Sequence, residues 1–490
     1  MTANAVRLQT ISDINKSSVG RLRRDLGTLE SYATLIGILI GAGIFQVTST
    51  AWLLTGPSVI LGYLVLTPAI LATSIPYAAY LSTPLGKEPG GEYLHISRSL
   101  NGFRLAYIGA WLKIISYIGA GAYLADALAG YVIALSGDRL EEARFRLPLA
   151  LVALFLFYLI HVIGIKWFGR FQVIMSTLKV LALLVLIIPG LFVVKLSNYT
   201  PFLTQGLSGF SLSLLPLFFA YAGFESLAQT AGEVKNSTKR LPGILLKGIS
   251  FTALLYVLTS IVSFGVLPAG RLESRSAPMA EVASFYLPGG AAIFVTVGAI
   301  AAIMTALNGT MFVPSRVALM FVKDRLAPTW LGVVNESTAT PIRALSLTLV
   351  CCVALLVSGQ LSLALNVAVF ALVVLYFIHS LIFLFLPRLN PALASEVAIT
   401  LPRWLLRAAA AFSVVSMGIL IIIQLYQDFG VLSSTTFSQR IVKHSLTSVE
   451  LIAIWGVMGA VLYWLARVSS NRPSGFQSAP EVTSANSNGN

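Results

Sequence analysis

Twelve long apolar runs dominate this 490-residue sequence and limit the folds that the chain can adopt. A hydrocarbon core of about 30 Å takes about 20 helical residues to cross, and each run is of that order. With 57% hydrophobic and only 11% charged residues, the chain also has too few polar groups to cover a soluble surface. We therefore predict an all-α polytopic membrane protein with about twelve transmembrane helices. The runs lie at residues 31–54, 58–81, 105–135, 147–163, 172–194, 211–232, 244–266, 289–321, 343–358, 362–386, 405–426 and 448–466.

The polar ends and the basic residues indicate the orientation of the chain. Residues 1–28 form a polar leader, and the apolar run after it is longer than the apolar part of a signal peptide, so we expect it to stay as the first helix. With the amino terminus inside, most of the 33 Lys and Arg residues fall in cytoplasmic segments, as the positive-inside rule requires. Residues 468–490, rich in Ser, Asn, Pro and Gly, predict a disordered cytoplasmic tail. The sequence thus predicts a plasma (inner) membrane protein with both termini in the cytoplasm. The net charge of +14 reflects this topology and not nucleic-acid binding, which would need a basic face or stripe.

Glycines interrupt two of the runs at matching places. Gly41, Ala42 and Gly43 lie near the middle of the first run. Gly223, which is followed by the acid Glu225, lies in the sixth run. Because glycine weakens a helix, we predict that helices one and six are discontinuous at these points.

The two breaks indicate two related halves. Runs one to five and runs six to ten each begin with a broken helix, and because five is an odd number the second half must enter from the opposite side. We expect a five-plus-five inverted repeat, in which substrate binds near the bilayer midplane between the broken helices. Residues 29–386 would then form a transport core, and residues 387–467 would add two helices outside the repeat.

The broken segments offer backbone groups to a small zwitterion. Unpaired backbone groups are costly inside a membrane unless a polar partner replaces them. A carboxylate suits the free amides of residues 41–43 at the start of the outer half-helix, and an ammonium suits the carbonyls freed near Ile40, Phe219 and Tyr221. Close helix packing through the GxxxG pair Gly37 and Gly41 is the alternative. The candidate substrate-binding residues are Ile40, Gly41, Ala42, Gly43, Phe219, Ala220, Tyr221, Ala222 and Gly223.

Four segments together resemble those of the amino acid-polyamine-organocation (APC) permeases. They are GILIGAGIF in the first run, PGGEYLHISRSL before the third, FFAYAGFESLAQTAGEVKN in the sixth and NGTMFVPSRVALMFVKDRLAP at the end of the eighth. The resemblance implies a leucine-transporter-like fold with the substrate between helices one, three, six and eight. It also implies main-chain recognition of an amino acid at the two breaks.

Several ionisable residues lie deep within the predicted spans. Lys179 matches a helix-five lysine that takes the place of a sodium ion in some members of the resembled family, which implies proton coupling; snorkelling to the interface is the alternative. Glu225 has family counterparts tied to proton coupling or gating, and it fits a carboxylate that caps freed amides equally well. Asp126 could neutralise a cationic substrate, but we favour a pair with an arginine near the external mouth. Lys113 is expected to snorkel.

These features favour a secondary active transporter that moves amino acids by alternating access, with a proton as the coupling ion and without a cofactor. A neutral amino acid of moderate size is the favoured substrate, since Ala222 and Gly223 leave space beside aromatic residues. An exchanger or a sodium-coupled symporter of the same fold is the alternative within transport, and a receptor or channel is the alternative outside it. An enzyme is disfavoured, because the sequence has no P-loop, no GxSxG elbow and no Cys/His cluster. The two cysteines, Cys351 and Cys352, are adjacent and support neither a disulfide framework nor a metal site.

Overall fold

The computed structural model of the chain describes residues 22–136, 141–267, 278–359, 361–442 and 446–470. Regular structure in these ranges is helical, apart from an isolated bridge between Leu26 and Val234. The predicted tails lie largely outside the described residues. The helices are α2 (Thr28–Leu39), η1 (Gly43–Val47), α3 (Thr48–Thr55), α4 (Val59–Leu81), α5 (Glu92–Leu100), α6 (Arg104–Leu135), α7 (Glu142–Ile163), α8 (Ile165–Gly190), α9 (Gly206–Tyr221), α10 (Ser226–Gln229), α11 (Ser237–Val266), α12 (Pro278–Tyr286), α13 (Gly289–Lys323), α14 (Ile342–Val357), α15 (Leu361–Leu389), α16 (Pro391–Ser395), α17 (Arg403–Ser434), α18 (Phe437–Val442) and α19 (Ser448–Ser470).

The apolar runs form the predicted spanning helices, which confirms an all-helical, multi-pass membrane protein. Among the described residues, eleven helical stretches are long and apolar enough to cross a bilayer. The ninth run differs, because it forms the 16-residue helix α14, which begins after Pro341 and ends before Gly359 with its φ of 72°. At 1.5 Å per residue this helix is about 24 Å long, which is shorter than a hydrocarbon core of about 30 Å.

The first spanning helix is broken where the glycines predict. Helix α2 ends at Leu39, and the amide of Gly41 donates to the Leu39 carbonyl at 2.9 Å, a turn too tight to continue an α-helix. The chain resumes with one π-helical segment, η1, and continues as α3. Gly43 is needed here, because a Cβ atom at this position would collide with the backbone of Ala220 on α9. The glycine therefore lets the two broken helices touch.

The sixth spanning helix is broken at the second predicted position. Helix α9 ends at Tyr221, four residues follow in turns, and α10 begins at Ser226. Gly223 has a φ of 104°, a conformation that favours glycine. The backbone conformation of Gly223 is thus incompatible with a continuous α-helix at this point.

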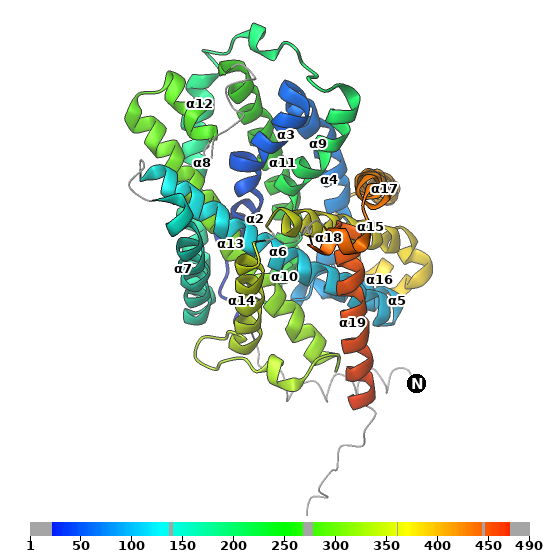
Figure 1. Cartoon of the computed structure of the whole chain (residues 1–490). Helices are drawn as coiled ribbons and strands as arrows, with labels where there is room; N and C mark the ends of the chain where they lie inside the picture. Colours follow the sequence, from blue (N-terminus) through cyan, green and yellow to red (C-terminus); the bar gives the residue numbers. More distant parts are fainter. Residues whose placement is uncertain (1–21, 137–140, 268–277, 360, 443–445, 471–490) are drawn as a thin grey trace, which may run out of the picture.

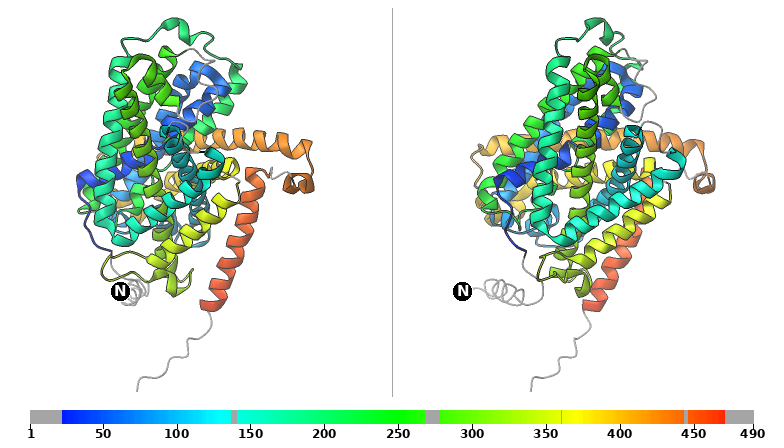
Figure 2. Two further views of the ribbon diagram at one scale, coloured as in Figure 1. Left: turned by 60° about the vertical axis from the view of Figure 1, so that its left-hand side comes forward. Right: turned by 90° about the vertical axis from the view of Figure 1, so that its left-hand side faces the viewer.

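The broken helices lie in the interior of the bundle (Figure 1). Helices α2, α6 and α13 occupy the middle of the view, whereas α17 and α19 lie at one edge and project from the rest of the molecule in Figure 2. Burial agrees with this, since 72% of the apolar stretch Thr28–Phe45 is buried within the protein but only 6% of Ser448–Ala466. Helices α17–α19 are therefore peripheral to the part of the fold that contains the breaks.

Candidate functional site

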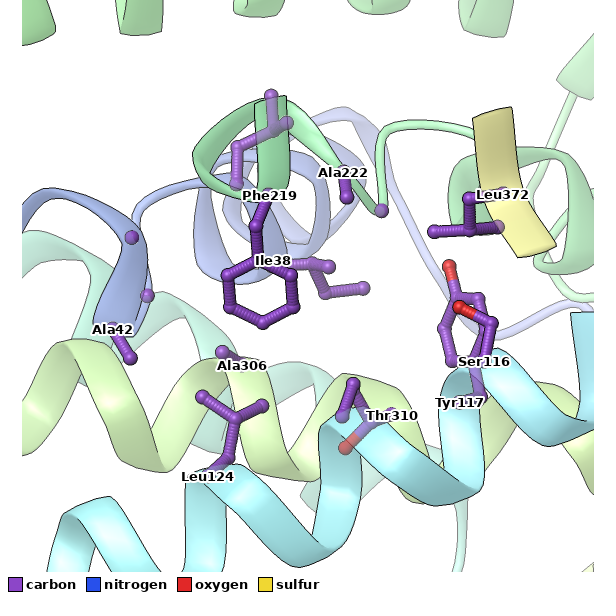
Figure 3. Close-up of a pocket in the computed structure, with 15 residues that line it drawn as sticks. Ile38, Ala42, Ser116, Tyr117, Leu124, Phe219, Ala222, Ala306, Thr310 and Leu372 are labelled. Atoms are coloured by element: carbon purple, nitrogen blue, oxygen red, sulfur yellow. The ribbon is translucent and has the colours of Figure 1, made fainter. Parts of the chain in front are cut away.

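A pocket lies beside both helix breaks (Figure 3). The space between atoms in and at the mouth of this pocket amounts to about 440 Å³, which includes solvent at its open edge. In Figure 3 the ring of Phe219 lies between an end formed by Ala42 and an end formed by Ser116 and Tyr117. The lining residues are Ile38, Leu39, Gly41, Ala42, Gly43, Ser116, Tyr117, Ala120, Leu124, Phe219, Ala222, Gly223, Ala306, Thr310 and Leu372.

Six of the nine predicted substrate-binding residues line this pocket. They are Gly41, Ala42, Gly43, Phe219, Ala222 and Gly223. The other three, Ile40, Ala220 and Tyr221, lie behind the lining. Their carbonyl or hydroxyl groups make other contacts: the Ile40 carbonyl accepts a hydrogen bond from Lys179 at 2.7 Å, and the Tyr221 hydroxyl pairs with Thr67 at 2.8 Å.

Backbone glycines and apolar side chains provide most of the pocket surface. The first amides of a helix have no partner within the helix, and residues 42 and 43 begin the outer half of the first span. The positive end of that helix dipole therefore faces the pocket at the Ala42 end. No charged side chain is among the residues that line the pocket. Such a site suits a ligand with a carboxylate and an uncharged, apolar remainder.

Tyr256 on α11 connects the two breaks from behind. Its buried hydroxyl lies within hydrogen-bond reach of two carbonyl groups, that of Leu39 at the end of α2 and that of Ala220 near the end of α9, the latter at 2.7 Å. The carbonyls of the last turn of a helix have no partner within the helix. With its single O–H, Tyr256 can donate to either carbonyl and so connects the ends of the two broken helices. Tyr256 was not among the predicted site residues, because nothing in the sequence of the α11 run distinguishes it from a packing tyrosine.

Lys179 on α8 contacts the backbone carbonyls at the end of α2. The Nζ atom of its fully buried side chain lies 3.0, 2.8 and 2.7 Å from the carbonyls of Ile36, Gly37 and Ile40, and 2.8 Å from the hydroxyl of Thr305 on α13, so its three N–H groups have four acceptors within reach. A positive charge is favourable at the negative end of a helix dipole. The lysine therefore contributes to the geometry of the first break and does not snorkel to an interface.

Glu225 accepts hydrogen bonds within the second break. One carboxylate oxygen accepts from the Gly223 amide at 3.0 Å and from the hydroxyl of Tyr376 on α15. The other accepts from Tyr117 at 2.6 Å, and the ring of this tyrosine lines the pocket. The carboxylate thus binds an amide freed by the break, as the capping alternative requires, although in the turn and not at α10, where no side-chain cap is present.

Lys113 on α6 is buried and paired, so the prediction that it snorkels is wrong. Its ammonium lies 2.7 Å from Glu92, which belongs to α5, and 3.9 Å from Glu225. Burial raises the pKa of the Glu92 carboxyl, and the Lys113 charge opposes that rise. Glu92 was not among the predicted site residues, because the α5 segment lies between two apolar runs and reads as a connection. In the sequence Glu92 is an acid in the PGGEY segment, four residues after Glu88. Nothing in this segment indicates which of the two carboxylates is buried.

Asp126 pairs with an arginine, as the favoured interpretation predicts. Two hydrogen bonds of 2.8 Å join it to Arg146 at the start of α7, and Arg146 also pairs with Glu142. Asp126 does not line the pocket. The charge of Asp126 is therefore balanced by Arg146, outside the pocket lining.

Comparison with known proteins agrees with this architecture. A family profile described as amino acid permease matches residues 26–467. The methylthioribose transporter of Bacillus subtilis (strain 168) is 29% identical over 357 residues, which cover 70% of this chain and 76% of the relative. The branched-chain amino acid permease BcaP of the same organism is 28% identical over 363 residues, with the same coverage of 70% and 76%. The chloroplastic cationic amino acid transporter 9 of Arabidopsis thaliana is 28% identical over 333 residues, 64% of this chain and 58% of the relative. The chain therefore belongs to the amino acid permease family of the APC superfamily.

Proposed function

We propose that this protein is a secondary active transporter that carries a neutral, apolar amino acid across the plasma (inner) membrane by alternating access. The observation that carries the proposal is a pocket that lies between the start of the outer half of the first span and the end of α9, with a lining of apolar side chains and no charge. The five-plus-five inverted repeat expected from the sequence would supply the two alternative arrangements of the broken helices. Cytoplasmic termini fit the distribution of basic residues.

The two ends of the bound amino acid differ in the groups that they meet. The carboxylate would accept from the amides of Ala42 and Gly43, where the dipole of the outer half-helix favours an anion. The ammonium would face carbonyls at the last turn of α9, beside Phe219. A side chain would then extend among Ile38 and the apolar residues of α6, α13 and α15.

The lining favours a neutral substrate over a cationic one. A lysine or arginine side chain would need an acid in the pocket, but Asp126 is paired with Arg146 outside it and Glu225 is satisfied behind it. Burying an unpaired charge would be costly. Of the substrates in the names of the relatives, branched-chain amino acids fit this lining best.

A binding screen tests the substrate class. Purified protein should be stabilised against thermal unfolding by L-leucine, L-isoleucine or L-valine, because ligand binding to the folded state raises the melting temperature. L-Arginine, L-lysine and methylthioribose serve as the discriminating arms. Saturable uptake of the stabilising amino acid into proteoliposomes would support a carrier. Stabilisation by methylthioribose alone, or none across the panel, would overturn the substrate class, and large single-channel currents would overturn the carrier.

We also propose that protons drive the transport and that Lys179 and Glu225 take part. Lys179 donates to three carbonyls at the end of α2, so loss of its proton would remove a charge and a donor from the first break. The geometry of the break, and with it the pocket, would then depend on the protonation of the lysine. A sodium-coupled mode is disfavoured, since the ammonium already supplies a cation at the α2 carbonyls.

Two substitutions test the coupling. Lys179→Gln and Lys179→Met should abolish accumulation driven by a proton gradient, whereas exchange of external for internal substrate should persist, because exchange needs no net proton movement. Lys166→Gln is the matched control, as Lys166 lies on the same helix with an exposed side chain. Gradient-driven accumulation that survives both substitutions would exclude Lys179, and uptake that requires sodium would exclude proton coupling.

A further inference from the structure

Two buried carboxylates share one ammonium group beside the pocket. Lys113 lies 2.7 and 2.9 Å from the two oxygens of Glu92 and 3.9 Å from the nearer oxygen of Glu225. All three side chains are at most 1% exposed. We call these three residues the charge cluster. It joins α5, α6 and the second helix break, which are far apart in the sequence.

Polar groups surround the charge cluster and orient both carboxylates. The Tyr77 hydroxyl donates to Glu92 at 2.9 Å, and the Gln229 amide donates to it at 3.3 Å. Around Glu225 the donors are two tyrosine hydroxyls and a backbone amide. These donors are Tyr117, Tyr376 and Gly223. Every carboxylate oxygen of the cluster therefore accepts at least one hydrogen bond.

The charge cluster has one more acid than base. With both carboxylates ionised it carries one excess negative charge, which is unfavourable in a buried site. The neighbouring titratable groups do not supply the missing positive charge. The phenols of the three tyrosines are neutral at physiological pH. Burial lowers the pKa of His95 to about 3, so this histidine, which pairs with His379 beside Tyr77, stays neutral as well. One bound proton would balance the cluster.

Tyr117 connects the charge cluster to the pocket. Its ring lines the pocket, its hydroxyl donates to Glu225, and the Lys113 ammonium lies 5.5 Å from the centre of the ring. The hydroxyl also lies 4.0 Å from the point where a Cβ of Gly223 would stand, so it borders the helix break. If Glu225 binds a proton, its new O–H can donate to the tyrosine oxygen. The Tyr117 hydrogen is then released to donate to an acceptor atom of a ligand.

We propose that Glu92, Lys113 and Glu225 form a proton-binding site in which Glu225 takes up the proton, and that Tyr117 couples its occupancy to ligand binding in the pocket. This inference rests on the proposed function and assigns Glu92 and Lys113 positioning roles in it. The step is a proton binding to the Glu225 carboxylate, with no other bond formed or broken. Coupling is reciprocal, so acid should strengthen ligand binding and ligand binding should take up a proton.

The experiment measures the affinity of the purified full-length protein for L-leucine as a function of pH. Wild type should bind about tenfold more tightly at about pH 5.5 than at about pH 8, with proton uptake on binding in weakly buffered solution. Glu92→Gln leaves the Lys113 charge to Glu225 alone, so the cluster no longer has an excess negative charge for a proton to balance. The midpoint of the affinity profile should therefore fall by about one pH unit or more. Glu88→Gln is the matched control, because it makes the same chemical change four residues earlier, at a side chain that is 45% exposed and pairs with Lys323.

Two further variants separate this role from a merely structural one. Glu225→Gln mimics the protonated acid and should give an affinity that is high and independent of pH. Tyr117→Phe keeps the acid but removes the connection, so its affinity should be low and independent of pH. If Glu225→Gln does not fold, Glu92→Gln and Tyr117→Phe still carry the test.

The failure of this inference differs from a failure of the proposed function. Leucine transport could be proton-driven and depend on Lys179 while the affinity profiles of Glu92→Gln and Glu88→Gln have the same pH midpoint. In that case the charge cluster is not the proton site. A pH profile in Tyr117→Phe that matches wild type would also overturn the inference. Absence of binding by any amino acid at any pH would overturn the proposed function itself.

Discussion

Tyr256 joins the two broken helices through its hydroxyl group. It is fully buried and bridges the carbonyls of Leu39 and Ala220. In Tyr256→Phe the Leu39 carbonyl keeps its bond from the Gly41 amide, but the Ala220 carbonyl loses this donor, and an unsatisfied buried polar group costs about 1–3 kcal/mol. We expect the variant to lose stability and also to bind L-leucine several-fold more weakly, because Tyr256 connects the ends of α2 and α9, which both border the pocket. Thermal unfolding and ligand titration measure the two effects.

Tyr199 provides the control for this prediction. Its hydroxyl donates at 2.7 Å to the carbonyl of Ile261, which lies on the same helix as Tyr256 but not in the pocket lining. Tyr199→Phe should lower stability and leave the affinity for L-leucine unchanged. Equal affinities in Tyr256→Phe and Tyr199→Phe would show that the bridge between the breaks does not contribute to binding.

Single residues differ in how far the sequence predicts them. Lys179 and Glu225 stand out in the sequence, because each is an ionisable residue within an apolar run. Their partners do not stand out, since the Lys179 ammonium binds main-chain carbonyls, which every sequence contains. Lys113 was placed wrongly, because its partner Glu92 lies 21 residues earlier and meets it only when α5 folds against α6. Pairs that depend on the packing of a connection leave no pattern in the sequence.

At the scale of the element, the contact between the two breaks limits which residues can occupy position 43. A Cβ atom on Gly43 would collide with the Cα and Cβ of Ala220 on α9. Overpacking of this kind typically costs about 1–3 kcal/mol, and here it would push apart the two helices that form the pocket. We expect Gly43→Ala to abolish uptake of L-leucine at normal expression, as measured in proteoliposomes.

Gly243 is the matched control, because it lies in the helix α11 and a Cβ there would meet no atom within 4 Å. Alanine is favoured over glycine in a helix by about 1 kcal/mol, so Gly243→Ala should be neutral or stabilising and keep full uptake. Uptake in Gly43→Ala equal to that in Gly243→Ala would contradict the close contact between the broken helices.

The sequence predicts elements better than it predicts their lengths and neighbours. The breaks follow from local chemistry, since glycine weakens a helix whatever surrounds it. The length of α14 depends on Pro341 and Gly359 at its ends, and the apolar run alone does not reveal that it stops after 16 residues. Helices α5 and α12 were missed, because short helices within connections carry little apolar periodicity.

At the scale of the whole molecule, the positions of the spans follow from hydropathy, but the pocket does not. Its lining combines residues from α2, α6, α9, α13 and α15, which lie up to 334 residues apart from Ile38 to Leu372. Glycine and acid patterns mark the two broken helices among these. Ser116, Thr310 and Leu372 belong to unbroken spans, and their sequence environment is that of any residue in a helix interface.

The peripheral helices allow stability to be separated from transport. Trp111 on α6 and Trp455 on α19 stack with ring centres 4.4 Å apart, and each indole donates to the backbone carbonyl of the other at 2.7 and 2.8 Å. Trp455→Phe removes one of these hydrogen bonds and should lower the free energy of unfolding by about 1 kcal/mol. Because α19 contributes no residue to the pocket, the affinity for L-leucine should not change. Trp464→Phe is the control, since Trp464 lies on the same helix and is 62% exposed. A loss of affinity in Trp455→Phe alone would show that α19 supports the pocket through α6, so that the division between a central core and peripheral helices would fail.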